Sequence, residues 1–355
     1  MIERDDLRAA VGSGLINEQQ AAGLISLADS RRGARESLNP GDEPFELFKG
    51  FNEIFIVIGL LIVSSGWWGV VAFILGDQMT DLQNSAGFVA LLGGGFLWLM
   101  SEYFVRKRRM VAPAIALSVM FAANAAFGFI AVLSEPFMVA QNDYSSVPFP
   151  LILATLTLAV YWWRFRVPFA MAMIAVGLFL VAIVFTASRG GRVDDISDFF
   201  LLSAGGPFAW ITLALGLLVF AVAMMFDISD PHRVTRRSAN GFWLHVVAAP
   251  ALVNTVALSL LERDSGGSNL ILLAVLAFFA LVAIVIDRRS FLIAAIGYIV
   301  ALAATVLDGN GAAWTVLLLG IVLLLLGAFW ERIRARVLRL VPGFVPLHRL
   351  PPSHV

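Results

Sequence analysis

Composition and charge place strong limits on the kind of protein that this sequence encodes. Of its 355 residues, 59% are hydrophobic and 14% are charged, and the mean hydropathy is +0.86. Soluble domains are about half apolar, so this composition indicates an integral membrane protein and excludes soluble enzymes, DNA-binding proteins and disordered scaffolds. The absence of cysteine excludes disulfides, thiolate metal sites and a cysteine nucleophile. Because 25 basic residues balance 25 acidic ones, the informative property is where the charges lie.

The first segment, residues 1–30, predicts a small helical hairpin outside the membrane. Gly12 to Gly14 break the first helix, and Asn17 followed by Gln20 has the spacing of a capping box at the start of the second. A DNA-reading helix-turn-helix is the alternative. However, residues 1–50 hold six basic and nine acidic groups, whereas nucleic-acid binding depends on cations that neutralise phosphates. We therefore expect no nucleic-acid partner, and docking against the protein's own loops or against a protein partner is favoured.

The rest of the chain divides by composition into four segments. Residues 31–45 form a linker rich in Gly, Pro, Ser and charge, and residues 46–53 predict an interfacial elbow at the membrane surface. A ten-span transmembrane domain at 54–330 follows, and a basic tail at 331–355 ends the chain. The fold class is therefore an all-α polytopic transmembrane helical bundle with a small amino-terminal helical hairpin.

Ten apolar stretches are long enough to cross a bilayer, which requires about 20 mostly apolar residues. Continuous apolar runs without alternation favour helices over a barrel. The predicted spans are 54–75, 86–104, 111–133, 147–163, 167–187, 201–226, 242–261, 269–286, 291–307 and 312–330.

Basic residues segregate to one side of these ten spans. Of the 25 Lys and Arg residues, 22 fall in the termini and in alternate connections, and three fall in the other connections. Because Lys and Arg favour the cytoplasmic side, this pattern predicts an even number of spans with both termini in the cytoplasm. The tail carries four arginines that should lie along the inner leaflet and contact anionic lipid. These candidate lipid contacts are Arg332, Arg334, Arg336 and Arg339.

Charged residues are absent from the centres of the predicted spans. Glu102 lies near the end of the second span and four residues before Arg106, which predicts an interfacial ion pair. A proton pump, a carboxylate-based exchanger and a voltage sensor require charge within the membrane, so this pattern argues against all three. No catalytic constellation, cofactor motif or metal-ligand set is present in the sequence, and we expect neither a cofactor nor enzymatic activity.

A few polar side chains inside the spans are candidates for a site. Pro250 and Asn254 lie one turn apart on the span that also contains His245, and Asn124 lies at similar depth in the third span. These four residues either line a cavity or form interhelical polar contacts that hold the helices together. Four deep tryptophans are interpreted as packing residues, with ligand stacking as the alternative. They are Trp67, Trp68, Trp98 and Trp210.

Two pairs of segments suggest an internal duplication, in which spans two to five are echoed by spans six to nine. Residues 109–116 (RMVAPAIA) resemble 246–253 (VVAAPALV). Residues 151–170 likewise resemble 270–294, because both are apolar helices that turn through basic residues. Apolar helices of one composition also resemble each other by chance, so the sequence leaves a true duplication open.

Short motifs at the two ends resemble those of uncharacterised, domain-of-unknown-function families of bacterial multi-pass inner-membrane proteins. They are the opening at 6–10 (DLRAA) and 14–20 (GLINEQQ), the elbow at 50–55 (GFNEIF), and the tail at 338–342 (LRLVP) and 349–352 (RLPP). The resemblance implies a bacterial inner-membrane location and assigns no functional residue.

Two classes of function agree with the sequence. The first is a non-enzymatic scaffold, sensor or accessory protein of the bacterial inner membrane, whose partners are membrane lipids and a protein bound through the amino-terminal hairpin. The second is a transporter or lipid flippase for a small or amphipathic solute, which ten spans and a duplication would allow.

Overall fold

The computed structural model divides the chain into two units, residues 1–44 and 45–355. Each unit is described by itself. The structure describes parts of 7–24, and then 51–77, 82–136, 138–141, 143–190, 196–202, 206–231, 233, 235–262, 266–291, 310–340 and 349–351. The predicted linker at 31–45 and the ninth predicted span beyond residue 291 lie outside these residues.

The first unit contains the helix boundary that the sequence predicts. The backbone N–H of Asn17 donates to Gln20 Oε1 at 3.0 Å, and the N–H of Gln20 donates to Asn17 Oδ1 at 2.7 Å. This reciprocal pair satisfies two amide groups that a helix start leaves without partners. Gly14 has a φ of +74°, a conformation that glycine adopts without strain, in the turn that precedes Asn17. The predicted capping pair is therefore confirmed.

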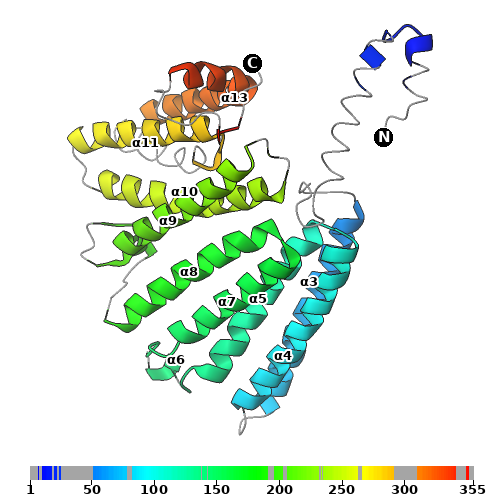
Figure 1. The fold of residues 1–355 in the computed structure, drawn as a ribbon. Coiled ribbons are helices and arrows are strands. Elements are labelled where there is room, and N and C mark those ends of the chain that lie inside the picture. The colour runs from blue at the N-terminus through cyan, green and yellow to red at the C-terminus, as the bar shows by residue number, and fades with distance from the viewer. Residues whose placement is uncertain are drawn as a thin grey trace. The chain divides into compact units, whose positions relative to one another are not determined.

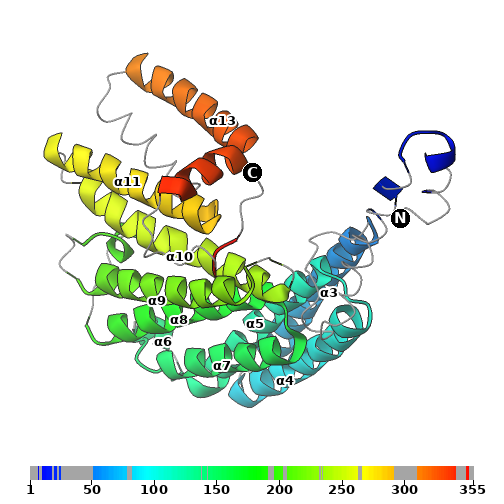
Figure 2. The ribbon, with the colours of Figure 1, turned by 45° about the horizontal axis from the view of Figure 1, so that its top comes forward.

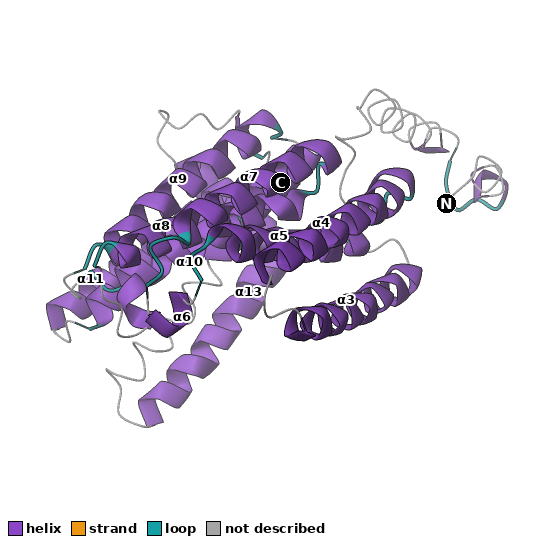
Figure 3. Ribbon diagram, turned by 90° about the horizontal axis from the view of Figure 1, so that it is seen from below, coloured by secondary structure: helices purple, strands orange, loops and turns teal. Residues whose placement is uncertain are grey.

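The second unit is helical throughout its described residues, which contain no strand (Figure 3). Its α-helices are α3 (Phe51–Asp77), α4 (Leu82–Ser101), α5 (Ala112–Leu133), α6 (Met138–Gln141), α7 (Pro148–Phe165), α8 (Pro168–Ser188), α9 (Phe208–Ser229), α10 (Arg236–Leu261), α11 (Gly266–Ile286) and α13 (Asn310–Leu340). A π-helix, η1 (Glu102–Lys107), continues α4, and a short 3₁₀-helix, η2 (Ile196–Phe199), precedes α9. α3 begins at Phe51, so it includes the last three residues of the predicted elbow.

Seven helical stretches in the described part of the chain are long and apolar enough to cross a membrane. They lie in α3, in α4 continued by η1, and in α5, α8, α9, α10 and α11. The fourth predicted span corresponds to α7, a helix of 18 residues, and the tenth lies within α13; neither belongs to this group of seven. The second unit therefore has the helices of an integral membrane protein.

The boundaries of α9 differ from the predicted span at 201–226. The helix begins after Pro207, which is its N-cap residue, and continues to Ser229. A proline cannot donate a backbone hydrogen bond, and it is well accommodated where a helix begins. Asp227, one residue beyond the end of the predicted span, consequently falls in the last turn of a candidate span.

Consecutive helices pack side by side in the second unit, with α10 at the centre of its carboxyl-terminal half (Figure 1). α10 packs against α8, α9 and α11. In its most apolar window 56% of residues are buried, compared with 11–28% in the other six candidate spans. Small residues such as Gly241, Ala248 and Ala249 are fully or nearly fully buried on α10. Small side chains allow helices to approach closely in a membrane.

Four tight turns bring basic residues to one end of this unit. Each turn contains one non-glycine residue in the left-handed conformation, with φ between +52° and +56°: Arg109, Arg166, Arg233 and Asp287. Side-chain contacts tie the turns to one another. They are Arg164–Glu102 at 2.7 Å, Trp162 Nε1 to Asn240 Oδ1 at 3.3 Å, and Arg233–Asp287 at 2.7 Å.

Glu102 forms the ion pair that the sequence predicts. Arg106 Nη1 lies 2.9 Å from Glu102 Oε2, and the predicted pair is therefore confirmed. Arg164, at the end of α7, contacts the other carboxylate oxygen at 2.7 Å. The carboxylate thus joins two of the basic turns.

The two segment pairs that suggested a duplication differ in their structural positions. Pro113 lies in the first turn of α5, whereas Pro250 lies inside α10, so the resemblance between 109–116 and 246–253 does not align equivalent positions. The segments of the second pair, 151–170 and 270–294, occupy more similar positions. The helices α7 and α11 that they contain are each followed by a residue with positive φ, Arg166 and Asp287.

α13 is bent at Phe329, which has non-helical backbone angles of φ −113° and ψ 19°. Figure 2 shows the segments before and after this bend at an angle to each other. The helix thus continues from the tenth predicted span into the basic tail, but it changes direction at this residue. The bend separates the apolar segment from the four arginines of the tail.

Glu53 fastens α3 to α5. Its side chain is 3% exposed, and Oε2 accepts hydrogen bonds from the backbone N–H groups of Val111 at 3.3 Å and Ala112 at 3.0 Å. These amides belong to the start of α5, where no intrahelical partner exists. Glu53 therefore acts as a helix cap supplied by a neighbouring helix.

We expect Glu53→Ala to lower the free energy of unfolding by about 1–2 kcal/mol, the usual effect of removing a cap. Glu53→Gln keeps an accepting oxygen and should lower the free energy of unfolding by less than Glu53→Ala does. Thermal unfolding of the purified protein in detergent checks both values. Equal midpoints for Glu53→Ala and the wild type would show that the cap contributes nothing.

Candidate functional site

A buried ionic cluster joins α9, α10 and the turn that follows α11. Asp227 Oδ2 lies 2.9 Å from His245 Nε2 and accepts a hydrogen bond from Arg288 Nε at 3.0 Å. Arg288 Nη2 bonds to Asp227 Oδ1, and it also donates to the backbone oxygen of Ser238 at 2.8 Å. The exposed fractions of Asp227, His245 and Arg288 are 3%, 0% and 7%. The bidentate geometry is the strongest form of an arginine–carboxylate pair.

Aromatic rings surround this cluster. The rings of Phe220 and Phe291 lie 5.4 Å and 6.0 Å from the His245 ring, and the Arg288 guanidinium lies 5.9 Å from the centre of Phe242. A charged group in such apolar surroundings requires a partner of opposite charge. Asp227 and Arg288 supply each other with that partner.

Gly241 makes room for the Asp227 carboxylate at the crossing of α9 and α10. A Cβ at position 241 would overlap Asp227 Oδ1 and lie 3.2 Å from the backbone oxygen of Ala223. Glycine is required at this position because α9 approaches it closely. Its backbone conformation does not require glycine, since its φ is not positive. The sequence therefore specifies the acidic residue and the space for it on two different helices.

A second group of polar contacts surrounds Asp287, next to the cluster. Its carboxylate lies 2.7 Å from Arg233 Nη1 and accepts from Trp330 Nε1 at 2.6 Å. Burial lowers the pKa of the Arg233 guanidinium, and the Asp287 carboxylate opposes that shift. These contacts join the α9–α10 turn, the end of α11 and the bend of α13.

The structure corrects the prediction that Arg334 contacts lipid. Arg334 is 1% exposed, and its guanidinium donates to the backbone oxygens of Ile284 at 3.2 Å and Val285 at 3.5 Å, and to that of Pro351. It therefore holds the tail against α11 and is not available to a headgroup. The other three predicted lipid contacts, Arg332, Arg336 and Arg339, are exposed.

We interpret the ionic cluster as a fastening between helices. Of its fully buried side-chain nitrogen and oxygen atoms, His245 Nδ1 alone has no partner within the described residues. Those residues contain no group of three His, Asp or Glu side chains that could hold a metal ion. A buried cluster in which the carboxylate and the guanidinium pair with each other has the features of a structural contact.

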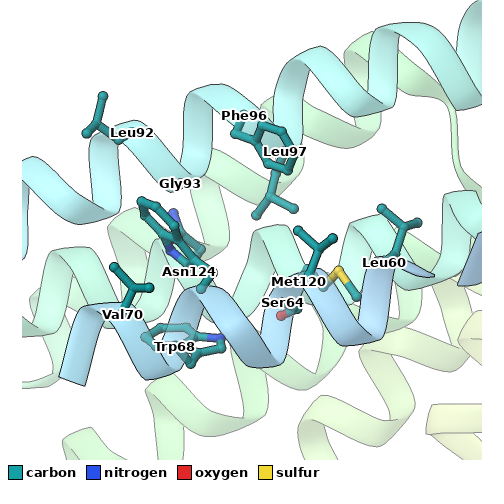
Figure 4. A pocket seen from close by; sticks show the side chains of 12 residues that line it. Leu60, Ser64, Trp68, Val70, Leu92, Gly93, Phe96, Leu97, Met120 and Asn124 are labelled. Atoms are coloured by element: carbon teal, nitrogen blue, oxygen red, sulfur yellow. The ribbon is translucent and has the colours of Figure 1, made fainter. Parts of the chain in front are cut away.

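A second site, the α3–α5 pocket, has different properties. It is a cavity of about 410 Å³ between α3, α4 and α5 (Figure 4). Apolar residues and two tryptophans dominate its wall. The lining residues are Leu60, Val63, Ser64, Trp67, Trp68, Val70, Leu92, Gly93, Phe96, Leu97, Met120 and Asn124. The pocket lies near the middle of all three helices and thus away from their ends.

Two polar groups of the pocket wall have no hydrogen-bond partner among the described residues. Asn124 is 5% exposed, and its Nδ2 donates to the backbone oxygen of Ala90 at 2.8 Å, which leaves its Oδ1 unpaired. Trp67 Nε1 is buried and also has no acceptor. Among apolar residues and the Ser64 hydroxyl, the pocket wall therefore includes a free acceptor and a free donor.

Gly93 brings these two groups to the same place. An ideal Cβ on Gly93 would lie 2.6 Å from Asn124 Oδ1 and 3.0 Å from Trp67 Nε1. Any larger residue would therefore push both polar groups aside. The missing side chain makes room for the donor and the acceptor side by side against α4.

The four polar residues singled out from the sequence do not form one site. Asn124 lines the pocket, whereas His245, Pro250 and Asn254 lie on α10 and do not line it. His245 contacts Asp227, Pro250 is exposed, and Asn254 is half-buried. The sequence pattern did not indicate Asp227, and for Trp67 it favoured packing, with ligand stacking as the alternative. One general rule points to a binding role for Trp67, since a buried indole N–H normally has a hydrogen-bond partner.

Comparison of the chain with protein-family models, with curated proteins and with solved structures finds no match. The resemblance to bacterial multi-pass membrane families therefore stays a prediction. Function has to be argued from the two sites and from the helices that carry them.

Proposed function

We propose that this chain is an integral membrane protein that binds an amphipathic or lipid-like molecule from the bilayer in the α3–α5 pocket. Of the two classes of function that the sequence leaves open, this proposal favours the transporter or lipid flippase over the scaffold. The observation that carries it is the pocket itself, an apolar cavity in the middle of three helices. Its volume of about 410 Å³ falls in the range of small-molecule sites.

The pocket is accessible from the outer face of the helices. Val63, Val70, Leu92 and Phe96 line it, and each is 46–51% exposed. In a bilayer that exposed surface faces acyl chains, so a ligand would enter sideways from the lipid. α3 forms one wall and is the least buried of the seven candidate spans, at 11%. A loosely packed wall helix is consistent with uptake from the bilayer.

We further propose the bacterial inner membrane as the location, with both termini in the cytoplasm. The location follows the resemblance of the two ends of the chain to bacterial multi-pass membrane families. The orientation is supported by the clustering of basic turns at one end of the second unit, since Lys and Arg favour the cytoplasmic side. The exposed arginines of the tail, Arg332, Arg336 and Arg339, are proposed to contact anionic lipid there.

Photolabelling in phosphatidylcholine vesicles tests the proposed binding. The probe is a diazirine-bearing hexadecane, which dissolves in the bilayer core and has no headgroup. We expect it to label Leu97 and Met120, two half-buried residues of the pocket wall, in preference to lipid-facing residues elsewhere such as Leu217. Val63→Trp should reduce labelling of Met120 severalfold, because the larger side chain fills the pocket.

Ile62→Trp is the matched control, because Ile62 is the exposed neighbour of Val63 and does not line the pocket. It should leave labelling of Met120 unchanged. If every lipid-facing helix is labelled equally and Val63→Trp has no effect, the pocket does not bind bilayer molecules and the proposal is wrong.

A further inference from the structure

The free donor and acceptor in the α3–α5 pocket lie where the bilayer supplies neither partner. Trp67, Gly93 and Asn124 lie near the middle of α3, α4 and α5, three helices that carry candidate spans. The core of a bilayer contains no water that would pair with exposed polar groups, and each unpaired group there is unfavourable by several kcal/mol. A partner brought by a ligand would relieve both groups.

The geometry restricts the chemistry of that partner. Asn124 Oδ1 only accepts hydrogen bonds and Trp67 Nε1 only donates them. A single hydroxyl group satisfies both, because its hydrogen donates to the amide oxygen while its oxygen accepts from the indole. A carbonyl or an ether would satisfy Trp67 alone, and a hydrocarbon would satisfy neither.

We infer that the α3–α5 pocket selects an apolar bilayer molecule with one hydroxyl group, which bonds to Asn124 Oδ1 and Trp67 Nε1 beside Gly93. The inference rests on the proposed function and adds the substrate class. Apart from the Ser64 hydroxyl, the remaining wall is hydrocarbon and aromatic rings, so it would hold an uncharged chain or ring system. No basic side chain lines the pocket to pair with a phosphate.

A buried water molecule is the alternative occupant of this space. Water also donates and accepts, and buried waters commonly pair with polar groups of a protein interior. If water satisfied the pair, a ligand's own hydroxyl would confer no advantage. Competition among matched ligands therefore separates the two occupants.

The experiment is competition against the diazirine-bearing hexadecane by dodecan-1-ol, dodecyl methyl ether and dodecane in the same vesicles. Each neutral hydrogen bond changes affinity by about fivefold. We therefore expect the alcohol to displace the probe from Met120 at a bilayer concentration about 25-fold below that of dodecane. The ether, which accepts but cannot donate, should fall between them.

Two variants assign the two bonds. Trp67→Phe keeps the ring and removes the N–H, so the ether should become equal to dodecane while the alcohol keeps about a fivefold advantage. Asn124→Leu removes the acceptor, so the alcohol should become equal to the ether. Trp210→Phe and Asn254→Leu are matched controls outside the pocket and should leave the order unchanged.

The outcomes separate this inference from the proposed function. If alcohol, ether and dodecane compete equally while Val63→Trp still blocks labelling, the pocket binds bilayer molecules and the hydroxyl inference is wrong. If the wild-type pocket is not labelled preferentially, the proposed function itself is wrong. Asn124→Leu also loses the hydrogen bond to the backbone oxygen of Ala90 and could therefore fail to fold. In that case the competition order in Trp67→Phe alone tests the hydroxyl inference.

Discussion

Asp227→Ala should lower the free energy of unfolding of the membrane unit by about 3–5 kcal/mol, the usual effect of breaking a buried ion pair. The substitution leaves the Arg288 guanidinium 7% exposed without its carboxylate, and it removes the partner of His245 Nε2. A buried charge without a counter-charge is far less stable than the pair. Unfolding by sodium dodecyl sulfate from mild detergent micelles measures the loss.

Two further variants distinguish a charge effect from a packing effect. Asp227→Leu combined with Arg288→Met replaces the pair by apolar side chains and should recover most of the lost stability, because hydrophobic replacement of buried pairs is often neutral. Asp143→Ala removes an exposed loop carboxylate and should leave the unfolding midpoint unchanged. If Asp227→Ala unfolds at the same sodium dodecyl sulfate concentration as the wild type, the cluster does not fasten the helices.

Arg334→Ala should lower the free energy of unfolding by about 2–3 kcal/mol, in the range of hydrogen bonds made by charged groups. The guanidinium donates to backbone oxygens on α11 and near the carboxyl terminus, and its loss leaves those buried oxygens without this donor. The same detergent titration measures the change. The loss is smaller than for Asp227→Ala because no opposite charge remains buried.

Arg336→Ala is the matched control for Arg334→Ala. Both residues lie on α13 after its bend, but Arg336 is exposed. Its removal should leave stability unchanged and, if the tail contacts anionic lipid, should weaken that contact. Equal stability for the two variants would contradict the assignment of Arg334 to the packed tail.

The positions of several helices follow directly from the sequence. The predicted spans at 54–75, 111–133 and 167–187 match α3, α5 and α8 within a few residues, because each is one continuous apolar run between polar turns. The predicted span at 201–226 matches less well. An apolar run continues across Gly206 and Pro207, and hydropathy alone does not show that the helix begins only after them.

The ionic cluster was not predictable from hydropathy. Asp227 lies one residue beyond the predicted span, and its partners His245 and Arg288 are 18 and 61 residues away. Asp227 and Arg288 lie near helix ends, where a charged residue normally faces water. Only the packing of α9, α10 and the turn after α11 shows that the three side chains meet inside the protein.

The pocket was predictable in part. Asn124 was a candidate from the sequence because it is an isolated amide in an apolar span. Trp67 was interpreted as a packing residue, with ligand stacking as the alternative, since a tryptophan in a membrane helix normally packs against neighbours or lipid. Its role depends on the space beside Gly93 and on the loose packing of α3. Both depend on how α3 lies against α4 and α5, which no local pattern in the sequence encodes.

Native mass spectrometry of the full chain, released gently from its own membrane, tests the central proposal most directly. We expect a stoichiometric, hydroxyl-bearing apolar molecule bound to the wild type and to Ile62→Trp, and absent from Val63→Trp. A stoichiometric protein partner with no such molecule, or a lipid bound equally to Val63→Trp, would contradict binding in the α3–α5 pocket and would favour a scaffold.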